Sequence, residues 1–303
     1  MKVIYGLKGI KKFRKPVVAL GVFDGVHRGH ARILSSAARL AQRIKGTSVA
    51  LTFDPHPQKE ESLTSLEHRL RLICDLGINV CIVVNFNRSF ARIPAKKFVE
   101  NILVKKIGAK YIYVGKNFRF GRAAAGDIHL LRKLSRPGNF KLKVFGVIKI
   151  KKRAVSSSYI RSLIMKADLK EAEKFLGRRV SALGTVIKGD SLGSRLGFPT
   201  ANINPHHEVL ASSGVYAAKI ILGKTNFKGA CYIGTRPTIV PRSEKKRVEV
   251  YIFNFRRNIY GKYLEVQFLK KIRPDQKFAT RALLAERIEK DIKFARAYFS
   301  RHS

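Results

Sequence analysis

The chain has 303 residues, of which 45% are hydrophobic and 27% are charged. This composition excludes an intrinsically disordered chain, and the length favours two domains rather than one core. The formal net charge of +42 indicates that the protein meets negatively charged partners, such as nucleotides, RNA or anionic membrane surfaces. Because the basic residues are spread along the chain without an RNA-recognition motif, a general bias of composition explains them as well, and we expect no specific nucleic acid partner.

The sequence gives no sign of membrane insertion or secretion. No apolar run approaches the about 18 residues that a membrane span needs. The first 15 residues lack the apolar core of a secretory signal. Cys74, Cys81 and Cys231 are odd in number and not spaced for a zinc site or a redox motif. We therefore expect buried free thiols in a cytoplasmic protein.

Apolar stretches alternate with amphipathic stretches in the first half of the chain. The pattern predicts helices over 28–45, 65–77 and 94–108. It predicts strands over 16–23, 47–53, 78–86, 109–115 and 140–150. This alternation favours an α/β domain with a doubly wound parallel sheet. Ligands bind at the carboxyl ends of the strands in such sheets, and polar motifs follow three of the predicted strands.

The alternation of predicted strands and helices ends near residue 178. Short strands separated by turn-like stretches are predicted over 179–189, 214–222, 227–234, 247–255 and 262–272. This pattern is typical of a small antiparallel β-barrel. A short helix over 166–179 precedes it, and a terminal helix over 277–301 follows. We place the domain boundary after residue 178, which gives domains 1–178 and 179–303.

The stretch GVFDGVHRGH, residues 21–30, leads from a predicted strand into a predicted helix. The first turn of a helix leaves backbone N–H groups without partners, and these attract anions together with the aligned peptide dipoles. Gly29 allows a ligand to approach the backbone, and His27 and His30 add imidazole groups. The two histidines by themselves are equally compatible with metal ligation or a structural role.

A second polar stretch, GDSLGSRLGFPTANI, covers residues 189–203. Its glycines give a backbone that can fold over a phosphate chain, although a glycine-rich barrel loop is also often a simple turn. Thr200 and Asn202 offer oxygen atoms of the kind that Mg²⁺ prefers. The glycines of this stretch are Gly189, Gly193 and Gly197.

Glu249 is an isolated carboxylate in an apolar predicted strand. Period-two alternation places it on the same face as Tyr251 and Phe253. A carboxylate is costly to bury there without a partner. One interpretation is a general base, which contributes typically about 10²–10⁴ in rate. The other is a rim carboxylate paired with one of the many lysines.

Five motifs together resemble the bacterial bifunctional riboflavin kinase/FAD synthetase family. They are GVFDGVHRGH, TFDPHP, VGKNFRFG, SSSYIR and LGFPTAN, in the family's order over nearly the whole chain. The first matches the HxGH signature of adenylyl and cytidylyl transferases. The resemblance implies that the barrel domain phosphorylates riboflavin to FMN, and that the nucleotidyltransferase domain adenylylates FMN to FAD and releases pyrophosphate. It implies ATP and Mg²⁺ for both steps, with riboflavin, FMN and ATP as partners and an oligomer possible.

The resemblance also implies a role for particular residues. Its catalytic residues correspond to His27, His30, Arg161 and Glu249. Contacts with ATP or its phosphates are implied for Gly21, Phe23, Asp24, Gly29, Ser157, Ser158, Gly189, Gly193, Gly197, Pro199, Thr200 and Asn202. Thr200 and Asn202 are also the implied magnesium ligands. Flavin contacts are implied for Phe53, Asp54, Asn117 and Arg273, with His56 beside the same pocket.

The chain departs from the family pattern at a few positions. Arginine is usual where Ser194 and Tyr159 stand, and aspartate is usual where Asn254 stands. None of these residues carries an assigned chemical role, so we expect both activities. Two other hypotheses remain from the sequence. The chain has one active site and one decayed site, or it is a basic RNA-binding protein in which the motifs are relics.

Overall fold

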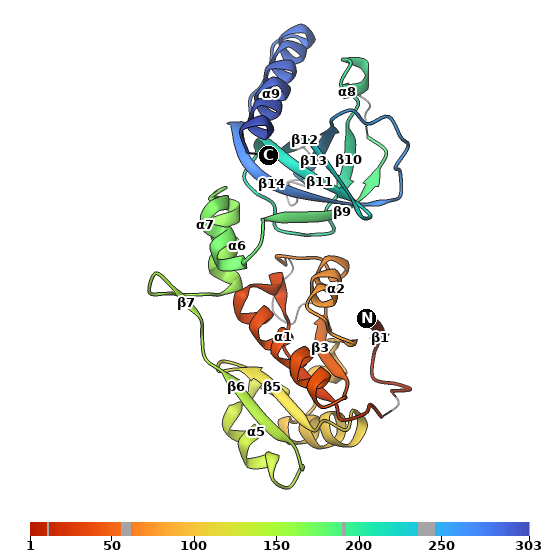
Figure 1. Ribbon diagram of the computed structural model, residues 1–303, viewed down its shortest axis with the longest axis vertical. Helices are drawn as coiled ribbons and strands as arrows, with labels where there is room; N and C mark the ends of the chain where they lie inside the picture. Colours follow the sequence, from red (N-terminus) through yellow and green to blue (C-terminus); the bar gives the residue numbers. More distant parts are fainter. Residues whose placement is uncertain (11, 56–61, 190–191, 236–245, 303) are drawn as a thin grey trace. The chain divides into compact units, whose positions relative to one another are not determined.

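The computed structural model describes residues 1–303 apart from 11, 56–61, 190–191, 236–245 and 303. The chain forms two compact units. The first comprises residues 1–62 and 66–157, and the second comprises residues 63–65 and 158–303. Figure 1 colours the first unit from red to yellow-green and the second, apart from residues 63–65, from green to blue. The predicted domain boundary after residue 178 stays a prediction.

A six-stranded parallel sheet forms the centre of the first unit. The strands lie in the order β1-β4-β3-β2-β5-β6, so the chain changes its direction of travel across the sheet between β2 and β5. This topology confirms the doubly wound α/β fold, and it places the usual ligand crevice at that switch. The strands are β1 (Lys2–Tyr5), β2 (Val17–Leu20), β3 (Ser48–Asp54), β4 (Val80–Asn85), β5 (Tyr111–Gly115) and β6 (Lys141–Phe145).

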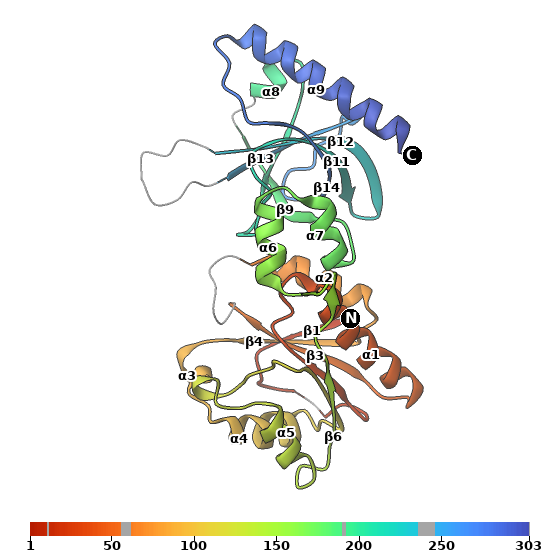
Figure 2. The ribbon, with the colours of Figure 1, turned by 90° about the vertical axis from the view of Figure 1, so that its left-hand side faces the viewer.

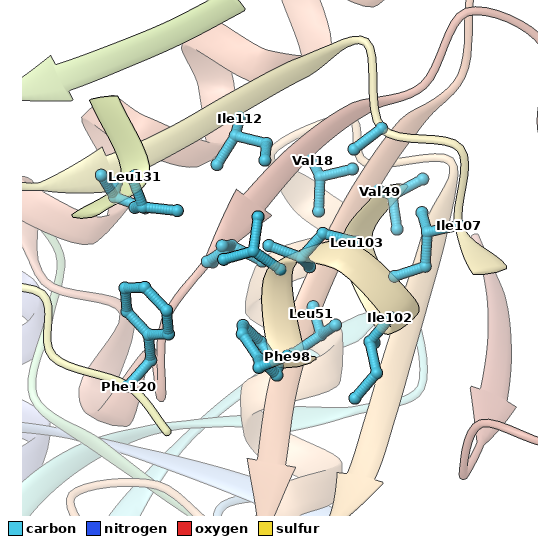
Figure 3. Close-up of a cluster of buried hydrophobic side chains, with 14 of the residues drawn as sticks. Val18, Val49, Leu51, Phe98, Ile102, Leu103, Ile107, Ile112, Phe120 and Leu131 are labelled. Carbon is cyan, nitrogen blue, oxygen red and sulfur yellow. The ribbon is translucent and has the colours of Figure 1, made fainter. Parts of the chain in front are cut away.

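Helices cover both faces of the sheet, because successive strand residues point to opposite sides. Val17 and Ala19 of β2 pack toward α1 and α2, whereas Val18 packs toward η2 and α5. Figure 3 shows the second of these clusters, with Leu103 of η2 against the sheet residues. The helices are η1 (Asp24–Val26), α1 (Arg28–Arg43), α2 (Leu66–Asp75), α3 (Arg88–Ala91), α4 (Ala95–Lys97), η2 (Phe98–Lys106), η3 (Arg122–Ala124) and α5 (Ile128–Ser135).

Several elements of the first unit differ from the sequence prediction, and the helices α3 and α5 were not predicted. β1 is an edge strand of four residues, too short to give a periodic signal. The helix expected over 94–108 begins as α4 and continues as a π-helical stretch, η2. The strand expected over 140–150 ends at Phe145, which pairs with the last residue of β5. The rest of that range forms a small hairpin of β7 (Lys149–Ile150) and β8 (Arg153–Ala154).

The second unit is built on a closed six-stranded antiparallel barrel, as predicted. Its strands are β9 (Ser181–Ile187), β10 (Ala201–Asn204), β11 (Gly214–Leu222), β12 (Thr225–Thr235), β13 (Lys246–Ile252) and β14 (Tyr263–Pro274). Its helices are α6 (Ser157–Met165), α7 (Leu169–Leu176), α8 (Leu192–Arg195) and α9 (Arg281–Arg301). β10 was not predicted, because its four residues overlap the polar PTAN motif.

The terminal helix α9 lies across the outer face of the barrel (Figure 2). Ala217 of β11, Ala230 of β12 and Ala295 of α9 are all buried in this contact. Small side chains allow a helix to approach a sheet closely, and the aromatic ring of Phe299 packs beside them. The barrel therefore has a second apolar core beneath α9 in addition to its interior.

The three cysteines are free thiols, and two of them are buried as expected. The expectation is wrong for Cys74, which is exposed. Cys74 lies on the solvent side of α2, whose buried face carries Leu70 and Ile73. Burial raises the pKa of Cys81 to about 12 and also raises the pKa of Cys231. The two buried thiols are therefore protonated at neutral pH and unreactive.

Candidate active sites

The first candidate site lies at the carboxyl ends of three adjacent strands, β3, β2 and β5. The segment 21–30 follows β2, Asp54 is the last residue of β3, and the exposed Asn117 follows β5. Because the strands are parallel, these ends share one edge of the sheet. The topology thus brings three separate sequence motifs together at the switch between β2 and β5.

His27 caps the N-terminus of α1. Its Nδ1 accepts a hydrogen bond from the backbone N–H of His30 at 3.3 Å. The two imidazole rings stack with their centroids 3.6 Å apart. A Cβ atom at Gly29 would lie 3.1 Å from Cε1 of His27, so this position needs a small residue. Since the cap occupies Nδ1, Nε2 is the atom through which His27 can donate to a ligand.

His30 is held as a neutral imidazole. Burial lowers its pKa well below the ordinary value, and the charges of His27 and Arg69 lower it further. A hydrogen bond with the backbone of Asp24 acts in the opposite direction, to a smaller extent. Nδ1 of His30 is buried and has no hydrogen-bond partner among the residues that the structure describes. An unpaired buried nitrogen is unfavourable, so a ligand that bonds to it gains free energy.

The lowered pKa of His30 predicts that stability falls in acid. The unfolded chain protonates this histidine near pH 6.5, whereas the folded chain does so only at lower pH. The unfolded state therefore binds more protons below this pH, and the free energy of unfolding decreases as the pH falls. We expect His30→Asn to weaken this decrease between about pH 7.5 and about pH 5.5, measured by urea unfolding. His129→Asn, at an exposed histidine, should retain it; an unchanged decrease in His30→Asn would contradict the prediction.

The turn between β2 and α1 has a strained backbone. Phe23 and Val26 adopt positive φ values of 55° and 38°, which are unfavourable for residues with a Cβ atom. Both side chains are buried, which compensates for this cost. A Cβ atom at Gly21 would lie 2.9 Å from the Phe23 ring. The carbonyl of Asp24 accepts a hydrogen bond from Ser157 Oγ at 3.1 Å. Asp24 therefore helps to fix this turn through its backbone.

Arg69 of α2 belongs to the site, although the sequence analysis did not single it out. Its side chain is 2% exposed. Nη1 donates to the carbonyl of Val22 at 2.9 Å, and Nη2 donates to Asp54 Oδ1 at 3.3 Å. The guanidinium thus connects the loop after β2 with the end of β3. The sequence signal is the spacing of Leu66, Arg69 and Leu70, which places the arginine on the apolar face of the helix.

The predicted flavin contacts of the first unit have different environments. Phe53 is buried and packs against Phe86 and Phe90, with ring centroids 5.9 and 5.8 Å apart. Asp54 pairs with Arg69, and Asn117 is exposed. His56 lies outside the described residues. Contact of these residues with a flavin stays a prediction.

The SSSYIR motif begins a helix, α6, as expected. Ser157 belongs to the first unit, whereas Ser158 and Arg161 belong to the second. Tyr159 packs edge-on against Phe175 of α7, with ring centroids 4.9 Å apart. This contact gives a structural reason for an aromatic residue at that position. The reach of Arg161 to ATP phosphates stays a prediction.

The second candidate site is a row of residues across the outer face of the barrel. The register pairs Asn202 of β10 with Glu249 of β13, and Glu249 with Tyr232 of β12. The row continues through Val215 of β11 to Arg273 of β14. Adjacent strands are about 4.8 Å apart, so the residues form a continuous line. Three residues that the resemblance singled out, Asn202, Glu249 and Arg273, therefore share one row.

Glu249 is partnered but remains accessible. Arg247 Nη1 lies 3.1 Å from Oε1, and Thr200 Oγ1 donates to Oε2 at 3.4 Å. The Glu249 side chain is 20% exposed. Tyr251 shares this strand face, whereas β13 ends at Ile252 and Phe253 follows the strand. The carboxylate is thus oriented by two side chains while it can still meet a substrate.

The loop between β9 and β10 keeps space around the oxygen donors. A Cβ atom at Gly189 would overlap the Asn202 side chain, and one at Gly193 would lie 2.9 Å from Thr200 Oγ1. Gly197 has a φ of 86°, which favours glycine. Pro199 directly precedes Thr200 and is exposed. Glycines are therefore needed where a side chain would displace the predicted ligands.

The donor set at this loop fits Mg²⁺. Thr200 supplies a hydroxyl oxygen, Asn202 an amide oxygen, and the neighbouring Glu249 a carboxylate. These are hard ligands, which Mg²⁺ prefers to nitrogen or sulfur. Within the part of the chain that the structure describes, no three His, Cys, Asp or Glu residues gather as a transition-metal site would require.

Arg273 is fixed by the terminal helix. Its Nε donates to both oxygens of Asp291 in α9, at 2.9 and 3.1 Å. The Arg273 side chain is 9% exposed, and its guanidinium lies 5.6 Å from the centroid of the Phe278 ring. The arrangement places a cation and an aromatic ring at one end of the row that contains Glu249.

The fold and the two candidate sites are typical of an enzyme that transfers phosphate-containing groups at two separate places. One site combines stacked histidines with a helix N-terminus at a topological switch point, and the other combines a carboxylate with a hydroxyl and an amide. Residues 10–159 match the family model of FAD synthetase, and residues 176–299 match that of riboflavin kinase.

Curated relatives match over almost the full length of the chain. The bifunctional riboflavin kinase/FMN adenylyltransferase of Buchnera aphidicola from Schizaphis graminum is 34% identical over 99% of each chain. The Escherichia coli K12 protein of the same name is 32% identical over 99% of this chain and 98% of that one. The Bacillus subtilis protein is 33% identical over 94% and 93%. The chain belongs to the bifunctional riboflavin kinase/FMN adenylyltransferase family.

A solved structure has the same overall architecture. It is a Streptococcus pneumoniae protein described as a macrolide-efflux protein, with a TM-score of 0.82 and 26% identity over 98% of this chain and 99% of that one. Among the described residues of the present chain, the helices are all too short or too polar to span a membrane.

Proposed function

We propose that this chain phosphorylates riboflavin to FMN on its barrel and adenylylates FMN to FAD on its α/β unit, with ATP as the donor in both steps. Family membership over the full length supports both activities. The observation that carries the assignment is that each family match contains its own cluster of polar side chains. We assign the two activities to residues 1–178 and 179–303, in a cytoplasmic enzyme with free thiols.

In the kinase step, Glu249 is the general base. It accepts the proton of the riboflavin 5′-hydroxyl, whose oxygen then bonds to the γ-phosphorus of ATP while the bond to ADP breaks. Arg247 and Thr200 orient the carboxylate. Thr200 and Asn202 would hold Mg²⁺, which, when bound, neutralises charge on the ATP phosphates.

In the adenylyl step, a phosphate oxygen of FMN bonds to the α-phosphorus of ATP, and pyrophosphate leaves. The attacking oxygen is already anionic, so the step needs no general base. His27 donates a hydrogen bond to the phosphates through Nε2, and the negative charge of the phosphates favours a proton on Nδ1 of His30, which then donates as well. The N-terminus of α1 adds backbone N–H groups. Arg161 adds a positive charge from α6, while Arg69 keeps the loop after β2 in place.

The direct test is product analysis. Purified protein is incubated with riboflavin, ATP and MgCl₂, and the flavins are separated by chromatography. We expect FMN to appear first and FAD to follow, and we expect EDTA to prevent both. FMN without FAD would support the hypothesis of one decayed site. No flavin turnover, together with RNA affinity that falls steeply with salt, would favour the RNA-binding hypothesis instead.

A further inference from the structure

Tyr232 forms a contact that the kinase chemistry above does not use. It lies next to Glu249 in the register of β12 and β13. Its hydroxyl donates to Asp275 Oδ1 at 3.0 Å. A Cβ atom at Gly234 would overlap the Tyr232 hydroxyl. The phenol thus fills space that the glycine at 234 leaves open, and it reaches away from β12 to the segment after β14.

The segment that Tyr232 contacts connects β14 with α9 and includes Asp275 and Phe278. One end is fixed by Arg273, which pairs with Asp291 and donates from Nη1 to the carbonyl of Pro274 at 3.0 Å. The other end is fixed by Thr280, which caps α9. Between these ends, Asp275 is exposed, and its carboxylate accepts the Tyr232 hydrogen bond. Tyr232 therefore ties the middle of the segment to the strand beside Glu249.

The protonation state of Tyr232 is suited to this contact. Burial, with the neighbouring Asp275, raises the pKa of Tyr232 to about 12. The hydroxyl therefore keeps its proton at neutral pH and can donate a hydrogen bond to the carboxylate of Asp275. Hydrogen bonds to charged groups are stronger than those between neutral groups, which makes a single bond able to order a short segment.

We propose that Tyr232 is a positioning residue of the kinase site: its hydrogen bond to Asp275 holds the segment 274–280 against the barrel, so that Phe278 and Arg273 lie in a fixed place relative to Glu249. This proposal rests on the kinase function proposed above. The segment then forms one wall of the riboflavin subsite, and the tyrosine sets the affinity for the flavin rather than the chemical step.

Tyr232→Phe tests this proposal because it removes the hydroxyl and retains the ring. We expect the KM for riboflavin to increase about tenfold, because a hydrogen bond to a charged group is lost, while kcat changes by less than about twofold. Asp275→Ala should have the same effect, and the double variant should be no worse than either single variant, because both remove one contact. Asp275→Asn retains an acceptor oxygen and should restore most of the affinity.

Two controls separate positioning from general damage. Tyr260→Phe removes the hydroxyl of an exposed tyrosine in the same barrel and should leave the KM for riboflavin unchanged. FAD formation from supplied FMN should be equal in all variants, since it uses the other site. Thermal melting checks that each barrel is folded.

The outcomes distinguish this proposal from the function on which it rests. If the unmodified protein makes no FMN, the kinase assignment fails. If it makes FMN but Tyr232→Phe keeps the original KM, the positioning role is wrong. Additive effects of Tyr232→Phe and Asp275→Ala, or a loss confined to kcat, would also overturn it.

Discussion

Replacing Glu249 by glutamine lowers the rate of FMN formation by about 10²–10⁴-fold, because the amide cannot accept the proton of the riboflavin hydroxyl. The amide has nearly the same shape as the carboxylate, so Thr200 can still donate to its oxygen and the barrel should fold normally. FAD formation from supplied FMN should remain within about twofold of the original rate. The measurement follows each half-reaction separately by chromatography, with riboflavin or FMN as the starting flavin.

Glu289→Gln is the matched control for this substitution. Glu289 pairs with Lys293 on the exposed side of α9, so its change removes one negative charge without touching the row that contains Glu249. We expect both rates to be retained in this variant. Equal loss of both activities in Glu249→Gln would contradict the assignment of two separate sites, and full FMN formation would show that Glu249 is only a rim carboxylate.

Replacing His30 by alanine has the reciprocal effect. We expect FAD formation to decrease by about 10²–10³-fold, the usual cost of removing one donor to a transition-state charge. The decrease combines the loss of the hydrogen bond to the phosphates with the loss of contacts inside the protein. The ring stacks on His27 and bonds to the backbone of Asp24. FMN formation from riboflavin should be unchanged, because Glu249 and its partners belong to the barrel.

His30→Asn and His129→Ala make the second prediction specific. Asparagine offers a neutral donor at a similar place, so it should recover part of the rate if His30 acts by hydrogen bonding. His129 is an exposed histidine of α5, and its loss should leave both activities intact. A fall in FMN formation in His30→Ala would indicate that the two activities depend on a common site.

Periodicity was sufficient to predict the central strands of the sheet and most of the barrel. β2, β3 and β4 are almost completely buried, so their residues are continuously apolar and easy to recognise. The short strands β1 and β10 escaped because four residues do not establish a period and because β10 carries polar site residues. The predicted helices, by contrast, begin and end in the structure within a few residues of the positions that proline and glycine indicated.

Motif recognition indicated two candidate sites but did not describe their internal contacts. Thr200, Asn202 and Glu249 were expected at one site, and the register brings them together. The role of Arg69 was missed, because a basic residue on a helix is normally solvated and only packing reveals that this one is buried. Tyr232 was missed for a similar reason, since its partner Asp275 lies 43 positions further along the chain, in the segment after β14.

The sequence by itself determined the two fold classes and the order of the motifs, since these depend on the local periods of 2 and 3.6 and on glycine, proline and histidine at fixed spacing. The tertiary structure alone decided which residues of different elements meet, such as Glu249 with Tyr232 on the neighbouring strand and Arg273 with Asp291 of α9. It also decided that His30 is neutral. These properties depend on strand register and on burial, and both are set by contacts between residues that are far apart along the chain.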